Sequence, residues 1–146
     1  MAGALLTVRF NLQTSCDALA ESVRLIEEHA GEPSFEEAYR QALRARNGLF
    51  HARRAWCDLM SVGQPQMPVT GVAGGRRDGH QKAAQALREA IAAMEPAAVA
   101  GTSGNDVTAA GERAGACMTA AEDGFREYLG YLKDEVGRRL SLTRGR

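Results

Sequence analysis

The chain of 146 residues lacks several features that mark membrane-spanning and secreted proteins. It has no run of about 18 apolar residues, so we expect no transmembrane helix and no membrane partner. The short apolar stretch near the N-terminus is not preceded by basic residues, unlike a secretory signal peptide. The three cysteines show no Cys-x-x-Cys pairing. We therefore expect a cytoplasmic protein with reduced thiols.

An excess of charge of one sign is also absent. The 18 basic residues are balanced by 18 acidic ones, so no overall electrostatic field would draw the chain to nucleic acid or an anionic surface. Hydrophobic residues make up 45% of the chain and charged residues 25%, which is typical of a folded domain. This length and composition predict a single domain over residues 1–146.

What the chain does have is helical periodicity. Apolar residues recur at alternating steps of three and four, which places them on one face of an α-helix. The longest such stripe contains Val107, Ala110, Ala114, Cys117, Ala121, Phe125, Tyr128, Leu132, Val136 and Leu140. A similar stripe begins at Leu5. Another begins at Phe35, includes Leu49, Trp56 and Leu59, and is expected to face the core. A shorter one begins near Ala83. The pattern predicts an all-α fold, an antiparallel four-helix bundle in up-down-up-down order.

Helix breakers divide these stripes. The first helix is expected over residues 5–30, followed by a short link to an antiparallel second helix. Ser34 and Glu37 have the spacing of a capping box at the start of that second helix. The Gly- and Pro-rich segment 62–79 predicts a long flexible loop between the second and third helices. Residues 141–146 predict a frayed basic tail.

One short segment resembles a catalytic motif. From Arg46 to His51 the chain reads Arg-Asn-Gly-Leu-Phe-His, which is similar to the R-N-x-x-x-H motif of HEPN ribonucleases, all-helical domains that usually dimerise around one RNA-cleaving cleft. The resemblance implies that His51 acts as general acid or base, that Arg46 stabilises the charged transition state and that Asn47 positions them. The structural alternative is that these residues belong to the solvated side of the second helix. That side carries Arg40, Arg44, Asn47, His51, Arg54 and Asp58.

The sequence predicts no cofactor and no metal site. No histidine follows a glutamate at the Glu-x-x-His spacing of dimetal bundles. Cys16, Cys57 and Cys117 fall on or beside the apolar stripes, which favours packing in the core over binding a metal as thiolates.

The second helix also carries a second apolar line, offset from its main stripe. This line consists of Tyr39, Leu43, Phe50, Cys57 and Met60. One face per helix is enough for a four-helix core, so the additional apolar area is available to a neighbouring helix or another subunit. The alternative is that the second helix is central in a wide core.

These observations favour a non-enzymatic helical assembly or interaction protein that acts through apolar helix faces. The expected interaction surface is Tyr39, Leu43, Phe50 and Met60, and the expected partner is another protein or a second copy. The alternative is a HEPN-like metal-independent ribonuclease or RNA-binding module that uses Arg46, Asn47 and His51. Nucleic acid is the less favoured partner because the net charge is zero.

Overall fold

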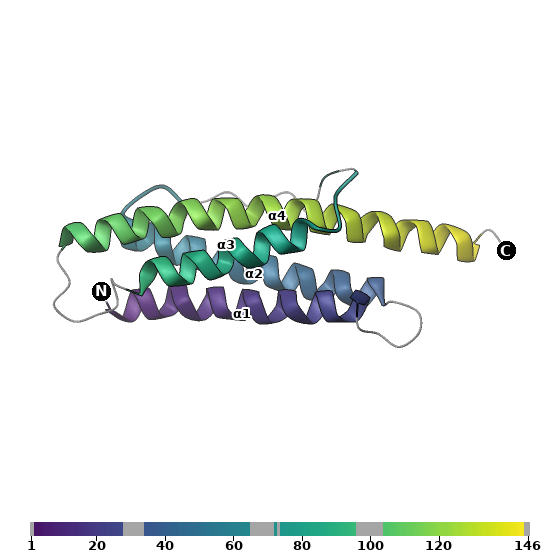
Figure 1. Cartoon of the computed structure of the whole chain (residues 1–146), viewed down its shortest axis with the longest axis horizontal. Coiled ribbons are helices and arrows are strands. Elements are labelled where there is room, and N and C mark those ends of the chain that lie inside the picture. The colour runs from purple at the N-terminus through teal and green to yellow at the C-terminus, as the bar shows by residue number, and fades with distance from the viewer. Residues whose placement is uncertain (1, 28–33, 65–71, 73, 96–103, 145–146) are drawn as a thin grey trace.

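The computed structural model describes residues 2–27, 34–64, 72, 74–95 and 104–144. These contain four helices, α1 (Ala2–Glu27), α2 (Phe35–Met60), α3 (Gly79–Met94) and α4 (Gly104–Arg144). The described residues contain no strand. The predicted all-α four-helix bundle is thus confirmed (Figure 1). Within the described residues, no helix is long and apolar enough to cross a membrane.

The helix boundaries correct three details of the sequence prediction. Helix α4 continues to Arg144, so residues 141–144 of the predicted frayed tail are helical, and residues 145–146 lie outside the described residues. Helix α3 begins at Gly79, which had been placed in the loop. Ser34 is the N-cap of α2 but makes no side-chain capping bond. The carboxylate of Glu37 instead accepts a hydrogen bond from Arg40 at 2.8 Å, so the capping box does not form.

Neighbouring helices in the bundle are antiparallel. In three of the four packed helix pairs, residues nearer the end of one helix contact residues nearer the start of the other. These contacts are Ser15–Ala45 and Ser22–Ala38 between α1 and α2, Arg9–Glu95 and Glu27–His80 between α1 and α3, and Phe35–Tyr131 and Trp56–Gly111 between α2 and α4. Figure 1 shows the same antiparallel relation between α3 and α4.

The chain order is therefore up-down-down-up, and the up-down-up-down order is wrong. Helices α2 and α3 run in the same direction and lie diagonally, since α1 packs on α2 and α3, and α4 also packs on α2 and α3. The length of the second connection explains the difference. Met60 ends α2 beside Gly111, whereas Gly79 begins α3 beside Gly124. The chain between them must travel about 20 Å along α4, because a helix rises about 1.5 Å per residue.

Most of the core side chains that α2 contributes are small, whereas the second half of α4 contributes large ones. Helix α2 contributes a row of fully buried alanines at positions 38, 42, 45 and 52. The second half of α4 contributes its largest buried side chains, Phe125, Tyr128, Leu129 and Leu132. The stripe predicted for α4 is confirmed over Ala110–Leu132 except that Cys117 is only half-buried, and the stripe becomes exposed at Leu140.

Two glycines of α4 bring α2 close. The side chain of Met60 lies against Gly111, and the indole ring of Trp56 lies against Gly115. A methyl group added at either glycine would overlap these side chains. The Trp56 ring nitrogen also donates to the Gly111 carbonyl at 2.7 Å. Glycines one turn apart therefore make the notch that seats the tryptophan.

Candidate functional site

The structure brings Arg46 and Asn47 of the ribonuclease-like motif together but separates Arg46 from His51. Arg46 is buried, with 9% of its surface exposed, and its guanidinium lies 3.4 Å from the Asn47 side-chain oxygen. Asn47 and His51 are exposed. His51 lies five positions after Arg46 in the helix, which turns their side chains about 140° apart around the axis. The described structure therefore does not bring Arg46 and His51 into one cleft of a single copy.

The glycine inside this segment has a packing role. A Cβ at Gly48 would lie 3.1 Å from the Asn11 carbonyl oxygen and 3.2 Å from the Ser15 amide nitrogen of α1. Gly48 therefore allows α1 and α2 to approach closely at this level. At the same level of the bundle, the Ser15 hydroxyl donates a hydrogen bond to the Ala45 carbonyl at 2.7 Å.

The predicted interaction surface is half-buried. Tyr39 and Leu43 pack against the hydrophobic core, and Phe50 lies edge-to-face on His51 with ring centroids 5.9 Å apart. Met60 packs on Gly111 of α4. These four side chains therefore flank the bundle beside α4, and none of them is among the most exposed apolar residues.

A groove lies between α2 and α4 and begins at Met60. It is lined in part by Trp56, a residue predicted to lie in the core. Its volume is about 420 Å³. Trp56 and Met60 line one side, and the small side chains of Gly115, Ala116 and Thr119 line the other. Trp56 was predicted only as part of the main stripe of α2. The signal that could have found the groove is the Gly111/Gly115 spacing, one helical turn, which leaves room for an aromatic ring.

One end of this groove is closed by an ion pair between α2 and α4. Arg53 and Glu122 are in direct contact, and their side chains are only 22% and 19% exposed. The opposite end is lined by Val62, which is 48% exposed. The groove therefore has an apolar floor at Trp56, and both of its ends carry polar groups, since Glu112 and Thr108 line it near Val62.

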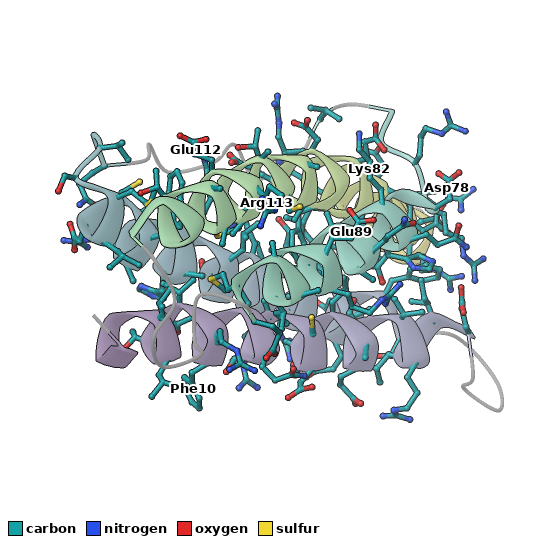
Figure 2. All side chains as sticks on the ribbon, turned by 60° about the vertical axis from the view of Figure 1, so that its left-hand side comes forward. Phe10, Asp78, Lys82, Glu89, Glu112 and Arg113 are labelled. Carbon is teal, nitrogen blue, oxygen red and sulfur yellow. The ribbon has the colours of Figure 1, made fainter. Side chains whose placement is uncertain are left out.

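The helices also leave apolar side chains outside the core. Leu6 and Phe10 lie one turn apart on α1 and are 59% and 72% exposed. Figure 2 shows Phe10 pointing away from the bundle. These two side chains are exposed, in contrast to the half-buried line on α2.

A buried polar network joins all four helices at the end where α3 begins. The Ser22 hydroxyl donates to the Ala38 carbonyl at 2.6 Å and lies 2.9 Å from the Tyr128 hydroxyl. The ring of Tyr128 also contacts His80, whose Nε2 lies 3.5 Å from the Glu27 carboxylate. Burial raises the pKa of Tyr128 to about 12, although the bond with Ser22 opposes the shift. Tyr128 is therefore a neutral structural group at physiological pH.

The three cysteines lie on different helices, α1, α2 and α4, and each is a free thiol. Burial raises the pKa of Cys16, Cys57 and Cys117 above the ordinary thiol value, so they remain protonated. Only Cys57 is fully buried, and the other two are half-buried. Across the described residues, no three His, Cys, Asp or Glu side chains are grouped to hold a metal ion.

Comparison with protein-family models, characterised proteins and solved structures found no match. The function of this bundle is therefore argued from its own surface. A groove lies beside Trp56, and the ribonuclease-like segment is divided between the interior and the solvent.

Proposed function

We propose that this chain is a non-enzymatic interaction protein that binds another polypeptide, or a second copy of itself, through the α2–α4 groove. The observation that carries the proposal is the position of Trp56 and Met60 along a groove whose other wall is made of small residues. Tryptophan and methionine are enriched in protein interfaces, and tryptophan is often the dominant contact.

The small residues opposite Trp56 support a polypeptide occupant. Ala116 and Thr119 are exposed on α4 and lie one turn or less apart. Short side chains allow another backbone to approach closely, as they do inside this bundle at Gly79 and Gly124. The half-buried line of Tyr39, Leu43 and Phe50 continues along α2 away from the groove. It would enlarge the contact once the groove is occupied.

Self-association is tested first by light scattering after size-exclusion chromatography. If the wild type forms a dimer, Ala116→Arg in the groove should convert it to a monomer because the arginine blocks close approach. The matched control is Ala92→Arg, which changes an exposed alanine of α3. This control should remain dimeric.

If the wild type is a monomer, the groove is tested by a second experiment, the selection of binding peptides. Peptides displayed on phage are selected on immobilised wild type and then tested against Ala116→Arg and Ala92→Arg. The proposal expects peptides that bind the wild type and Ala92→Arg but not Ala116→Arg. A monomer that selects no peptide dependent on Ala116 would refute the groove as a binding site.

The alternative, a HEPN-like ribonuclease that uses Arg46, Asn47 and His51, has less support because Arg46 is buried and His51 points to a different side of α2. Its test is cleavage of RNA by the wild type and by His51→Ala. Cleavage by the wild type that is lost in His51→Ala would favour this alternative. Equal cleavage by both proteins, or none by either, would exclude it.

A further inference from the structure

A separate surface lies on the outward side of α2. Between Glu37 and Asp58 this helix contains no acidic residue. Its exposed residues in this interval include Arg40, Arg44, Asn47, His51 and Arg54, which recur at steps of three and four. We call these five residues the basic row. Helical geometry aligns them along about 21 Å of the axis.

The charges of the basic row are available to a partner. Within the part of the chain that the structure describes, the exposed side chains of Arg44 and Arg54 make no hydrogen bond or ion pair. Arg40 is held only by Glu37 of its own helix, at 2.8 Å on the surface. Such exposed pairs contribute little and exchange readily. A second copy does not fit here, because two such rows would meet with like charges.

An aromatic pair lies in the middle of the row. The rings of Phe50 and His51 are in edge-to-face contact at 5.9 Å and 64°, between Arg44 and Arg54 along the helix. Phe50 is half-buried and His51 is exposed. Nucleobases stack on aromatic side chains while arginines contact the phosphates on either side, and this combination is typical of proteins that bind single strands.

We propose that the basic row of α2, together with Phe50, binds single-stranded nucleic acid. Arg40, Arg44 and Arg54 contact successive parts of the backbone, and a base stacks beside Phe50 and His51. No bond is made or broken, and buried Arg46 takes no part. The basic row shares no residue with the α2–α4 groove, and Phe50 is the one side chain that this site has in common with the proposed protein-binding surface.

The test is fluorescence anisotropy with a labelled 20-nucleotide oligouridine at pH 7.5. With three phosphate contacts, affinity should fall about twentyfold between about 50 and 200 mM salt, since each contact to a single strand contributes about 0.7 to the slope. The double variant Arg44→Gln with Arg54→Gln should bind about tenfold or more weakly at the lower salt. Its salt slope should fall by about 1.4.

The matched control removes two positive charges elsewhere. Lys82 and Arg113 are exposed and belong to α3 and α4 (Figure 2). Lys82→Gln with Arg113→Gln has the same net charge as the first double variant and should bind like the wild type. Phe50→Leu should weaken binding about fivefold without changing the salt slope, because it removes stacking and no charge. Circular dichroism verifies that every variant is folded.

Three outcomes would overturn the proposal. The first is equal loss in the two double variants, which would mean non-specific attraction. The second is binding of polyglutamate as tightly as oligouridine, which would point to an acidic protein partner. The third is no measurable binding of oligouridine by the wild type at 50 mM salt.

Discussion

Helix α4 uses glycine in two different ways on its two sides. Towards α2, Gly111 and Gly115 face the side chains of Met60 and Trp56. Towards α3, Gly124 faces backbone, and a Cβ there would lie 2.5 Å from the Ala83 nitrogen and 2.8 Å from the Gly79 carbonyl oxygen. A side chain can turn away from an added methyl group, whereas a helix backbone must move as a whole. The α3 side should therefore be the less tolerant one.

The α3 contact is reciprocal, which adds to its rigidity. A Cβ at Gly79 would itself lie 2.8 Å from the Gly124 carbonyl oxygen and 2.8 Å from the Tyr128 nitrogen. Farther along α4, the backbone of the connecting segment covers the helix, with Gly75 against Glu127 and Val72 against Gly130. The α3 side is thus packed backbone on backbone over several turns, and the α2 side is packed side chain on backbone.

The largest effect is expected for Gly124→Ala. The added methyl group would force α3 away from α4 and loosen Leu87 and Ala90 behind it, so the free energy of unfolding should fall by about 3 kcal/mol. Urea unfolding followed by circular dichroism measures the change. A loss no greater than that of Gly115→Ala would contradict the difference between the two sides.

The same end of the bundle allows a test by pH. Because Tyr128 has a pKa of about 12 in the fold and an ordinary value of 10.0, the folded state favours the neutral phenol. The stabilisation is complete below pH 10 and is lost as the pH rises from 10 to 12, by about 2 to 3 kcal/mol. Tyr128→Phe cannot ionise and should escape this loss.

At neutral pH, however, Tyr128→Phe should be less stable than the wild type by about 1 kcal/mol, because it lacks the hydrogen bond with Ser22. The measurement is urea unfolding of both proteins between pH 7 and 11.5. The two stabilities should become equal before about pH 11, and Tyr128→Phe should be the more stable protein at pH 11.5. If the free energies of unfolding of the two proteins changed in parallel with pH, water would have to reach the Tyr128 phenol, and this end of the bundle would not be tightly packed.

Gly115→Ala tests the side of α4 that faces α2, where the neighbouring Trp56 side chain can move away from an added methyl group. The Trp56 ring must rotate out of its notch and can lose its bond to the Gly111 carbonyl, at a cost of about 1 to 2 kcal/mol. Trp56 is the single tryptophan of the chain, so its fluorescence reports on this site alone. The emission should shift to longer wavelength as the ring becomes more exposed. An unchanged spectrum with a large loss of stability would mean that the helices had separated instead.

This comparison also explains what the sequence could and could not predict. The apolar stripes predicted four helices because periodicity is a local property. The partner of each glycine was not predictable, because it depends on which helices are neighbours. That in turn depends on the second connection, which is long enough to cross the bundle and place α3 beside α1 and α4.

The candidate sites show the same limit. Spacing placed His51 on the solvated side of the helix and Arg46 about 140° away, but it could not show that neighbouring groups bury Arg46. Trp56 fitted the main stripe of α2 and was therefore assigned to the core. Its position at the edge of a groove follows from the notch at Gly111 and Gly115, which lies in a helix more than 50 positions away.

The smallest effect, and the only stabilising one, is expected for Gly137→Ala. No atom lies within 4 Å of the Cβ position at Gly137, and the residue is exposed. The substitution should raise the free energy of unfolding by about 0.5 to 1 kcal/mol, because alanine loses less backbone entropy in a helix. This is the same chemical change as Gly124→Ala in the same helix, so the difference between the two variants isolates the contact with α3. A destabilised Gly137→Ala would show that this turn of α4 is covered, and the contrast would then have to be measured against another exposed position.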